Sequence, residues 1–129
     1  MISKRFSIFT ILLALLLTFG HNSYSQGVSD DEIILGMHTD ISGPVSSFGK
    51  YSVEGVQMRI DEINKAGGIH GRMLKIIAED HQYQVPRAVQ AANKLLNKDK
   101  IFLMVASLGT PMNNACLLYT SPSPRDETK

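Results

Sequence analysis

Polar side chains that could hold a ligand follow each of three short apolar runs in this 129-residue chain. The runs span residues 33–37, 73–78 and 101–106, and the polar segments after them span residues 39–48, 80–83 and 107–110. In the last segment Thr110 comes before Pro111, which favours a helix start there, with a hydroxyl and free backbone amides. The positive end of a helix dipole favours an anion, so a carboxylate is the natural guest. The alternative is that Thr110 only caps the helix.

The sequence lacks the glycine motifs of nucleotide-dependent enzymes. No glycine-rich turn ending in Lys-Ser or Lys-Thr follows a strand, so no phosphate-binding loop is predicted. Gly67, Gly68 and Gly71 follow a helical segment and precede a strand, the reverse of the dinucleotide-binding context. We interpret them as a helix stop and a turn. The chain is predicted not to be an enzyme, with no catalytic residue and no cofactor.

Histidines, serines and cysteine add no metal site and no nucleophile to this prediction. The three histidines after residue 25 show no metal-ligand spacing, so we expect ordinary polar or edge histidines and no bound metal; they are His38, His70 and His81. The serines near the first polar segment lack the strand-to-helix turn of a hydrolase nucleophile. A single cysteine, Cys116, excludes an internal disulfide.

Length and charge exclude several classes of protein. The chain is long enough for one domain and too short for two. Hydrophobic residues make up 43% and charged residues 19%, which is typical of a globular protein rather than a disordered one. Thirteen basic residues against twelve acidic ones give a formal net charge of +1, which leaves no surplus for binding a phosphate backbone. A nucleic-acid partner is not predicted.

The first 25 residues have the pattern of a secretory signal peptide. Lys4 and Arg5 precede an uncharged, largely apolar stretch over residues 6–20, which is shorter than a membrane-spanning helix needs. Ser23 and Ser25 are the small residues that a signal peptidase requires, so we expect cleavage after Ser25 and a periplasmic product. The alternative is a buried helix or a membrane anchor.

The last 14 residues, 116–129, break the pattern of the middle. Their Ser-Pro-Ser-Pro run and mixed charges show neither a helical nor a strand period. One interpretation is an exposed tail. The other, which we favour, is that the natural sequence is interrupted near Ala115 by a frame change or by joined foreign sequence.

Residues 26–115 alternate between strand and helix patterns. The three apolar runs predict strands, and the run over residues 101–106 is the most hydrophobic, so we expect it to be the most central. Apolar stripes predict two helices between the strands, through Val53, Val56, Ile60 and Ile63 and through Val85, Val89, Ala92 and Leu96. This order predicts an α/β fold, a parallel sheet with flanking helices in a βαβαβ arrangement.

The stretch from Ile33 to Asn114 resembles the branched-chain amino-acid binding proteins, the leucine/isoleucine/valine-type periplasmic receptors of ABC importers. Its most specific element is the Asn-x-x-Gly-Gly-Ile-x-Gly run that starts at Asn64. The other matching segments are Asp40 to Pro44, Phe48-Gly49, Gly55, Glu79-Asp80, Ala91 to Leu95 and Gly109 to Pro111. The resemblance implies the first part of lobe 1 of the type I periplasmic binding protein fold.

The resemblance also implies where a ligand binds. A small amino acid, or a related carboxylate or amide, would lie between two lobes, with its carboxylate on the loop after the third strand. Thr110 stands where a serine or threonine contact is expected, and Phe48 stands where an aromatic side chain covers the ligand. The implied ligand-binding residues are Ser42, Phe48, Ser107, Leu108, Gly109 and Thr110. The implied partner is the membrane permease of an ABC importer, and the complete protein is expected to be a monomer.

Two features depart from the leucine-type pattern. Phe48 replaces a common tyrosine, and Leu108-Gly109-Thr110-Pro111 replaces a serine-rich loop. The latter form is closer to family members that take other small carboxylates, amides or aromatic acids. Two other functions remain as alternatives: the periplasmic ligand-binding sensor part of a signalling receptor, and an enzyme of the flavodoxin-like or Rossmann type. The missing phosphate loop and the export signal disfavour the enzyme.

Overall fold

Three parallel strands form one sheet, in the order β2-β1-β3, in a computed structural model that describes residues 25–120. The strands are β1 (Glu32–Thr39), β2 (Met73–Asp80) and β3 (Leu103–Met104). β1 and β2 pair along their whole length, from Glu32 opposite Met73 to Thr39 opposite Asp80. The α/β class and the parallel sheet are therefore confirmed.

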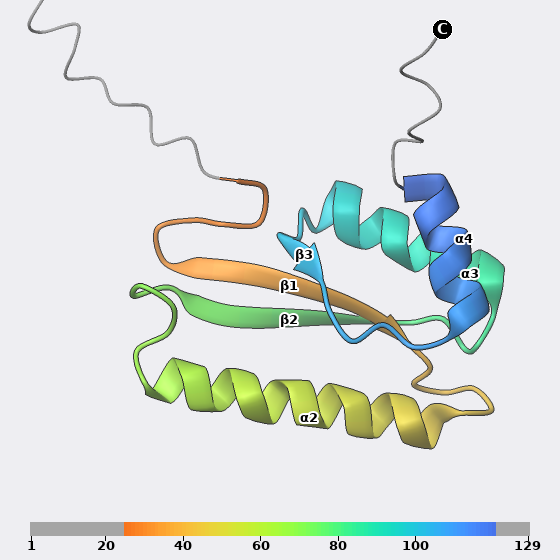
Figure 1. Cartoon of the computed structure of the whole chain (residues 1–129), viewed down its shortest axis with the longest axis horizontal. Helices are drawn as coiled ribbons and strands as arrows, with labels where there is room; N and C mark the ends of the chain where they lie inside the picture. The colour runs from red at the N-terminus through yellow and green to blue at the C-terminus, as the bar shows by residue number, and fades with distance from the viewer. Residues whose placement is uncertain (1–24, 121–129) are drawn as a thin grey trace, which may run out of the picture.

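Helices cover both faces of this sheet. They are α2 (Ser46–Lys65), α3 (Val85–Asn93), which continues into one π-helical segment, η1 (Lys94–Lys98), and α4 (Thr110–Thr120). α2 lies along one face, and α3 and α4 lie on the other (Figure 1). The chain thus crosses one face from β1 to β2 and the opposite face from β2 to β3, a doubly wound arrangement.

The third strand is neither as long nor as central as its hydrophobicity predicts. β1, not the third strand, is the middle strand of the sheet over the described residues, and the ladder at β3 covers only Leu103–Met104. Ile101 is 1% exposed because it packs against Gly36, whereas Phe102 and Leu103 are 46% and 42% exposed. An apolar run reports how much surface a strand can bury, but it does not specify how many strands lie beside it.

The apolar stripe of α2 faces the sheet as predicted, but that of α3 is displaced. In α2, Ile60 is 3% exposed and the other stripe residues are half-buried. In α3 the buried residues are Ala88, Ala91 and Ala92, whereas Val85 is 37% exposed. α3 packs against α4 as well as the sheet, and Ala88 and Ala92 join Met112 in one buried cluster. Small side chains occupy this contact because they let two helices approach closely.

The Asn-x-x-Gly-Gly element ends α2 and starts β2. Gly67 and Gly68 have φ values of +100° and +74°, and the Gly68 amide donates to the carbonyl of Ile63, which closes the helix. Asn64 pairs with the backbone of Leu74 through both ends of its amide, at 2.9 and 2.8 Å. The predicted helix stop is confirmed, and Asn64 sets where the next strand begins.

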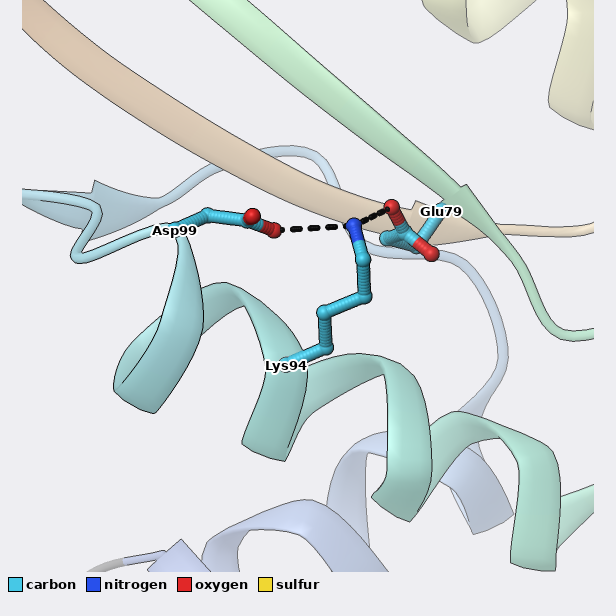
Figure 2. Close-up of polar contacts among 3 residues, drawn as sticks. All are labelled: Glu79, Lys94 and Asp99. Atoms are coloured by element: carbon cyan, nitrogen blue, oxygen red, sulfur yellow. Dashed lines mark hydrogen bonds and ion pairs between the residues drawn. The ribbon is translucent and has the colours of Figure 1, made fainter.

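Lys94, the first residue of η1, connects this helical segment to the sheet (Figure 2). Its Nζ lies 2.5 Å from Glu79 Oε1, near the end of β2, and 3.0 Å from Asp99 Oδ2, just after η1. Hydrogen bonds to Glu79 and then to Asp99 raise the pKa of Lys94 above its ordinary value. The ion pair with Glu79 ties η1 to β2, the strand whose carboxyl end forms part of the candidate site.

The structure describes only part of the two chain ends for which the sequence makes predictions. The signal-peptide segment up to residue 24 and the final nine residues, 121–129, lie outside the described residues. Gln26, the first residue after the predicted cleavage, donates from Nε2 to the carbonyls of Leu96 and Ile101. α4 runs through Cys116 to Thr120 without a break, and the proposed boundary there stays a prediction. Over residues 25–120, no helix has the length and apolarity to cross a membrane.

Candidate functional site

The carboxyl ends of the three strands meet at one edge of the sheet, and the loops after them are joined by hydrogen bonds. The Leu108 amide donates to the carbonyl of His38 over 3.1 Å, which places the loop after β3 beside the end of β1. Because the chain leaves the two strands over opposite faces, the gap between β1 and β3 is the switch point where ligands of such sheets bind. The candidate site is therefore built on these loops.

Two carboxylates shape the loop after β1. Asp40, fully buried, accepts hydrogen bonds from the amides of Gly43 and Val45, the latter over 2.8 Å, just before α2 begins. Asp80, at the end of β2, accepts from the amides of Ile41 and Gln82 over 2.9 and 3.0 Å. The loop is thus held by Asp40, the residue directly after β1, and by Asp80, the last residue of β2.

The side chain of Ser42 is a further hydrogen-bond partner of Asp80. Its hydroxyl donates to Asp80 Oδ2 over 2.6 Å and accepts from Gln82 Nε2 over 2.9 Å. Burial by itself would raise the pKa of Asp80, but hydrogen bonds from the Ser42 hydroxyl and from the Ile41, Gln82 and Ser42 amides lower it to about 2. The donor capacity of Ser42 is already used within the chain, so its expected role as a ligand contact stays a prediction.

Phe48 lies in the first turn of α2 rather than in the loop before it. The helix begins at Ser46, inside the segment 39–48 that the sequence predicts to be a loop. Gly49 is buried against the carbonyl of Asp40, and a Cβ atom at Gly49 would lie 1.8 Å from that oxygen. This close approach fixes the first turn against β1, while Phe48 remains 70% exposed at the same end of the sheet.

The loop from Ser107 to Thr110 is fixed at each residue but the last. The Ser107 hydroxyl accepts from the His38 amide over 3.4 Å, and the Ser107 carbonyl accepts from Asn113 Nδ2 over 3.1 Å. Gly109 has a φ of +100°, a conformation that favours glycine. Its carbonyl accepts from the Asn113 amide over 2.9 Å, so Gly109 holds the cap position of α4.

Thr110 is therefore the first residue of α4 and not its cap, contrary to one of the two predicted roles. Its side chain is exposed, and its hydroxyl makes no hydrogen bond with any residue in the described range 25–120. The hydroxyl stands free beside the amino-terminal end of the helix. It can donate to a ligand oxygen without first breaking a contact within the chain.

Two of the histidines that the sequence predicts to be ordinary polar or edge residues are buried beneath these loops. His38 and His81 are 1% and 0% exposed, with ring centroids 5.4 Å apart, so the expectation of ordinary polar or edge histidines is wrong for both. Burial, and then the neighbouring His81, lower the pKa of His38 from 6.5 to about 4, so that it is neutral at pH 7. The sequence feature that could have pointed to these two histidines is their position, since each lies at or directly after the carboxyl end of a strand.

Side chains beside His38 form a cavity. A cavity of about 400 Å³ is lined by His38, Leu96, Met104, Ser107, Asn113, Cys116 and Leu117. In the part of the chain that the structure describes, no three His, Cys, Asp or Glu side chains are grouped as a metal ion would require. The lining offers a ligand hydrogen-bonding groups on His38, Ser107 and Asn113 beside the apolar side chains of Leu96, Met104 and Leu117.

Comparison with known sequences decides the family. Residues 32–121 match the family described as periplasmic binding protein. The chain belongs to this family. Its relatives include the leucine-, isoleucine-, valine-, threonine- and alanine-binding protein of Pseudomonas aeruginosa, which is 33% identical over 93 residues, 72% of this chain and 24% of the relative. The leucine-specific-binding protein of Salmonella typhimurium is 36% identical over 73 residues, covering 57% of this chain and 20% of the relative.

Solved structures of periplasmic binding proteins have the same fold. A fatty acid ABC transporter substrate-binding protein from Thermomonospora curvata superposes with a TM-score of 0.71 at 31% identity, over 75% of this chain and 24% of that one. A branched-chain amino acid transporter substrate-binding protein from Streptococcus pneumoniae, in complex with isoleucine, superposes with a TM-score of 0.65 at 25% identity, over 68% of this chain and 25% of that one. This periplasmic binding protein chain thus spans between a fifth and a quarter of the length of these proteins.

Proposed function

We propose that the complete protein is an extracytoplasmic receptor that binds a small amino acid, or a related carboxylate or amide, and delivers it to the permease of an ABC importer. The complete protein is the product in which residues 26–115 continue into the rest of the receptor. Export would follow cleavage of residues 1–25. Receptors of this kind bind without chemical conversion, in keeping with the absence of enzyme motifs from the sequence.

The free hydroxyl of Thr110 is the observation that supports this proposal most directly. It stands at the amino-terminal end of α4, where unpaired amides and the helix dipole attract an anion. A carboxylate placed there would accept from the Thr110 hydroxyl and from the amides of Thr110 and Met112, since Pro111 between them has no N–H. Ser107, Leu108 and Gly109 would form the wall beside it, since they join β3 to this helix.

Phe48 supplies apolar surface for the rest of the ligand. Its ring is 70% exposed at the edge of the sheet where the three loops meet, and an aromatic ring can cover a ligand without needing a hydrogen bond. Ser42 borders the same edge through its contact with Asp80. We propose that the remaining part of the receptor encloses the ligand from the opposite side.

Ligand class is tested by titrating the complete protein calorimetrically with leucine, isoleucine, valine, threonine and alanine, and separately with a medium-chain fatty acid. The amino acids follow the name of the Pseudomonas aeruginosa relative, and the fatty acid follows that of the Thermomonospora curvata protein. We expect saturable binding of at least one amino acid. Binding of the fatty acid alone would overturn the amino-acid class, and binding of neither would overturn both.

A further inference from the structure

His81 occupies the junction between the loops after β2 and β3, and both of its ring nitrogens are engaged. Nε2 lies 3.0 Å from the carbonyl oxygen of Leu108, and Nδ1 lies 3.0 Å from the backbone nitrogen of Tyr83. The side chain is 0% exposed. A buried ring with two polar partners on different loops can act as a link between them.

The two partners fix which nitrogen holds the proton. A backbone N–H can only donate, so Nδ1 accepts from Tyr83. A carbonyl can only accept, so the proton is on Nε2 and is donated to Leu108. His81 is therefore held as one neutral tautomer, and rotation of the ring would break both contacts.

Hydrogen bonds therefore hold the backbone of Leu108 at both its amide and its carbonyl. The amide of Leu108 donates to His38 over 3.1 Å, and its carbonyl accepts from His81 over 3.0 Å. Gly109, with a φ of +100°, follows directly and turns the chain into α4 at Thr110. The orientation of Leu108 therefore sets the direction in which Gly109 and Thr110 face the ligand.

The same ring holds a strained segment of the neighbouring loop. Gln82 and Tyr83 have φ values of +51° and +56°, which non-glycine residues adopt rarely. Asp80 holds the Gln82 amide and His81 holds the Tyr83 amide, which offsets the strain. As a result, the Tyr83 ring stands next to Gly109, with Cε2 3.5 Å from where a Cβ atom would be.

We infer that His81 is a positioning residue of the ligand site, which fixes the loop that presents Thr110 by donating from Nε2 to Leu108. This inference rests on the proposed function, because the loop matters for affinity only if the carboxylate binds there. His81 itself is fully buried and acts through Leu108 and Tyr83 rather than on the ligand.

Two substitutions separate the contacts of the two nitrogens. The Gln side chain in His81→Gln is long enough to place an amide donor where Nε2 lies, so it can keep the bond to Leu108. The Asn side chain in His81→Asn can place its oxygen where Nδ1 lies and accept from Tyr83, but it does not reach Leu108. Ile60→Val in α2, a buried site away from the loops, serves as a control for general destabilisation.

Affinity for the tightest amino acid of the panel is measured by titration of the complete protein. We expect His81→Asn to weaken binding about tenfold, with His81→Gln and Ile60→Val within about threefold of wild type. Equal affinities for wild type and His81→Asn would overturn the inference. Equal weakening in His81→Asn and His81→Gln would also overturn it, because it would indicate a merely structural role.

Amide hydrogen exchange supplies a readout that needs no ligand. We expect the amides of Leu108 and Asn113 to exchange faster in His81→Asn than in His81→Gln or Ile60→Val. If the wild-type protein binds no amino acid, the proposed function fails, while the exchange rates still decide whether His81 fixes the loop. Equal exchange in the two His81 variants would overturn that role.

Discussion

The hydroxyl of Ser42 donates to Asp80 Oδ2 over 2.6 Å, and this contact joins the loop after β1 to the end of β2. Asp80→Asn and Ser42→Ala should each lower the free energy of unfolding by about 1 kcal/mol, the ordinary value of one hydrogen bond at a partly exposed site. The double variant should lose less than the sum, which chemical denaturation of the three variants can measure. Strict additivity would contradict a direct contribution from this pair.

The hydroxyl of Thr110 should be needed for affinity but not for stability. Replacing Thr110 with Val keeps the shape and removes a hydrogen bond to a charged group, worth roughly 1.5 to 3 kcal/mol, so binding should weaken by roughly ten- to more than a hundredfold. Thr110→Ser keeps the hydroxyl and serves as the matched control. Calorimetric titration measures both variants, and equal affinities for wild type and Thr110→Val would remove Thr110 from the site.

Phe48 and Tyr51 make a matched pair on α2. Their side chains are 70% and 72% exposed, but only Phe48 lies in the first turn, beside the loops. We expect Phe48→Ala to weaken ligand binding about tenfold, because part of the roughly 1.5 to 3 kcal/mol of a buried aromatic side chain is lost, and Tyr51→Ala to have little effect. A larger loss from Tyr51→Ala in the same titration would place the covering ring elsewhere.

Two glycines of α2 should respond to alanine in opposite directions. A Cβ atom at Gly49 would lie 1.8 Å from the Asp40 carbonyl oxygen, so Gly49→Ala should cost about 1–3 kcal/mol by pushing the helix from β1. Gly55 has no heavy atom within 4 Å of that position, so Gly55→Ala should stabilise the helix by about 0.5–1 kcal/mol. Urea unfolding tests both, and a shift of the same sign would contradict this account of Gly49.

His38 should make stability depend on pH in a defined window. The pKa of His38 is about 4 in the folded protein, whereas the ordinary value of 6.5 applies to the unfolded chain. Between about pH 4 and 6.5 the unfolded chain therefore binds more protons than the folded protein. The contribution of His38 to stability should be constant above pH 6.5 and fall as the pH drops from 6.5 to about 4, by on the order of 2 kcal/mol.

His38→Gln removes this titration and should flatten the unfolding free energy over the same window, whatever its own stability. Exposed His70→Gln is the control and should keep the wild-type slope. An unchanged slope in His38→Gln would assign the dependence on pH to other groups.

Local sequence patterns were sufficient for much of the fold. The period of the apolar residues in α2 and the glycines at its end depend on neighbours a few positions away, so the sequence alone determined where the helix faces the sheet and where it stops. The same holds for the position of Thr110 at a helix start after a strand, although the helix begins one residue earlier than predicted.

Only the tertiary structure decided which strand lies in the middle and which side chains support the site. The central place of β1 depends on the crossovers, and the displaced face of α3 depends on α4 packing beside it. His81 meets Leu108 across 27 positions of sequence, and Ser42 meets Asp80 across 38. The type of a residue and its spacing reveal whether it can donate or accept a hydrogen bond. Which residue it pairs with depends on which distant segments the fold brings into contact.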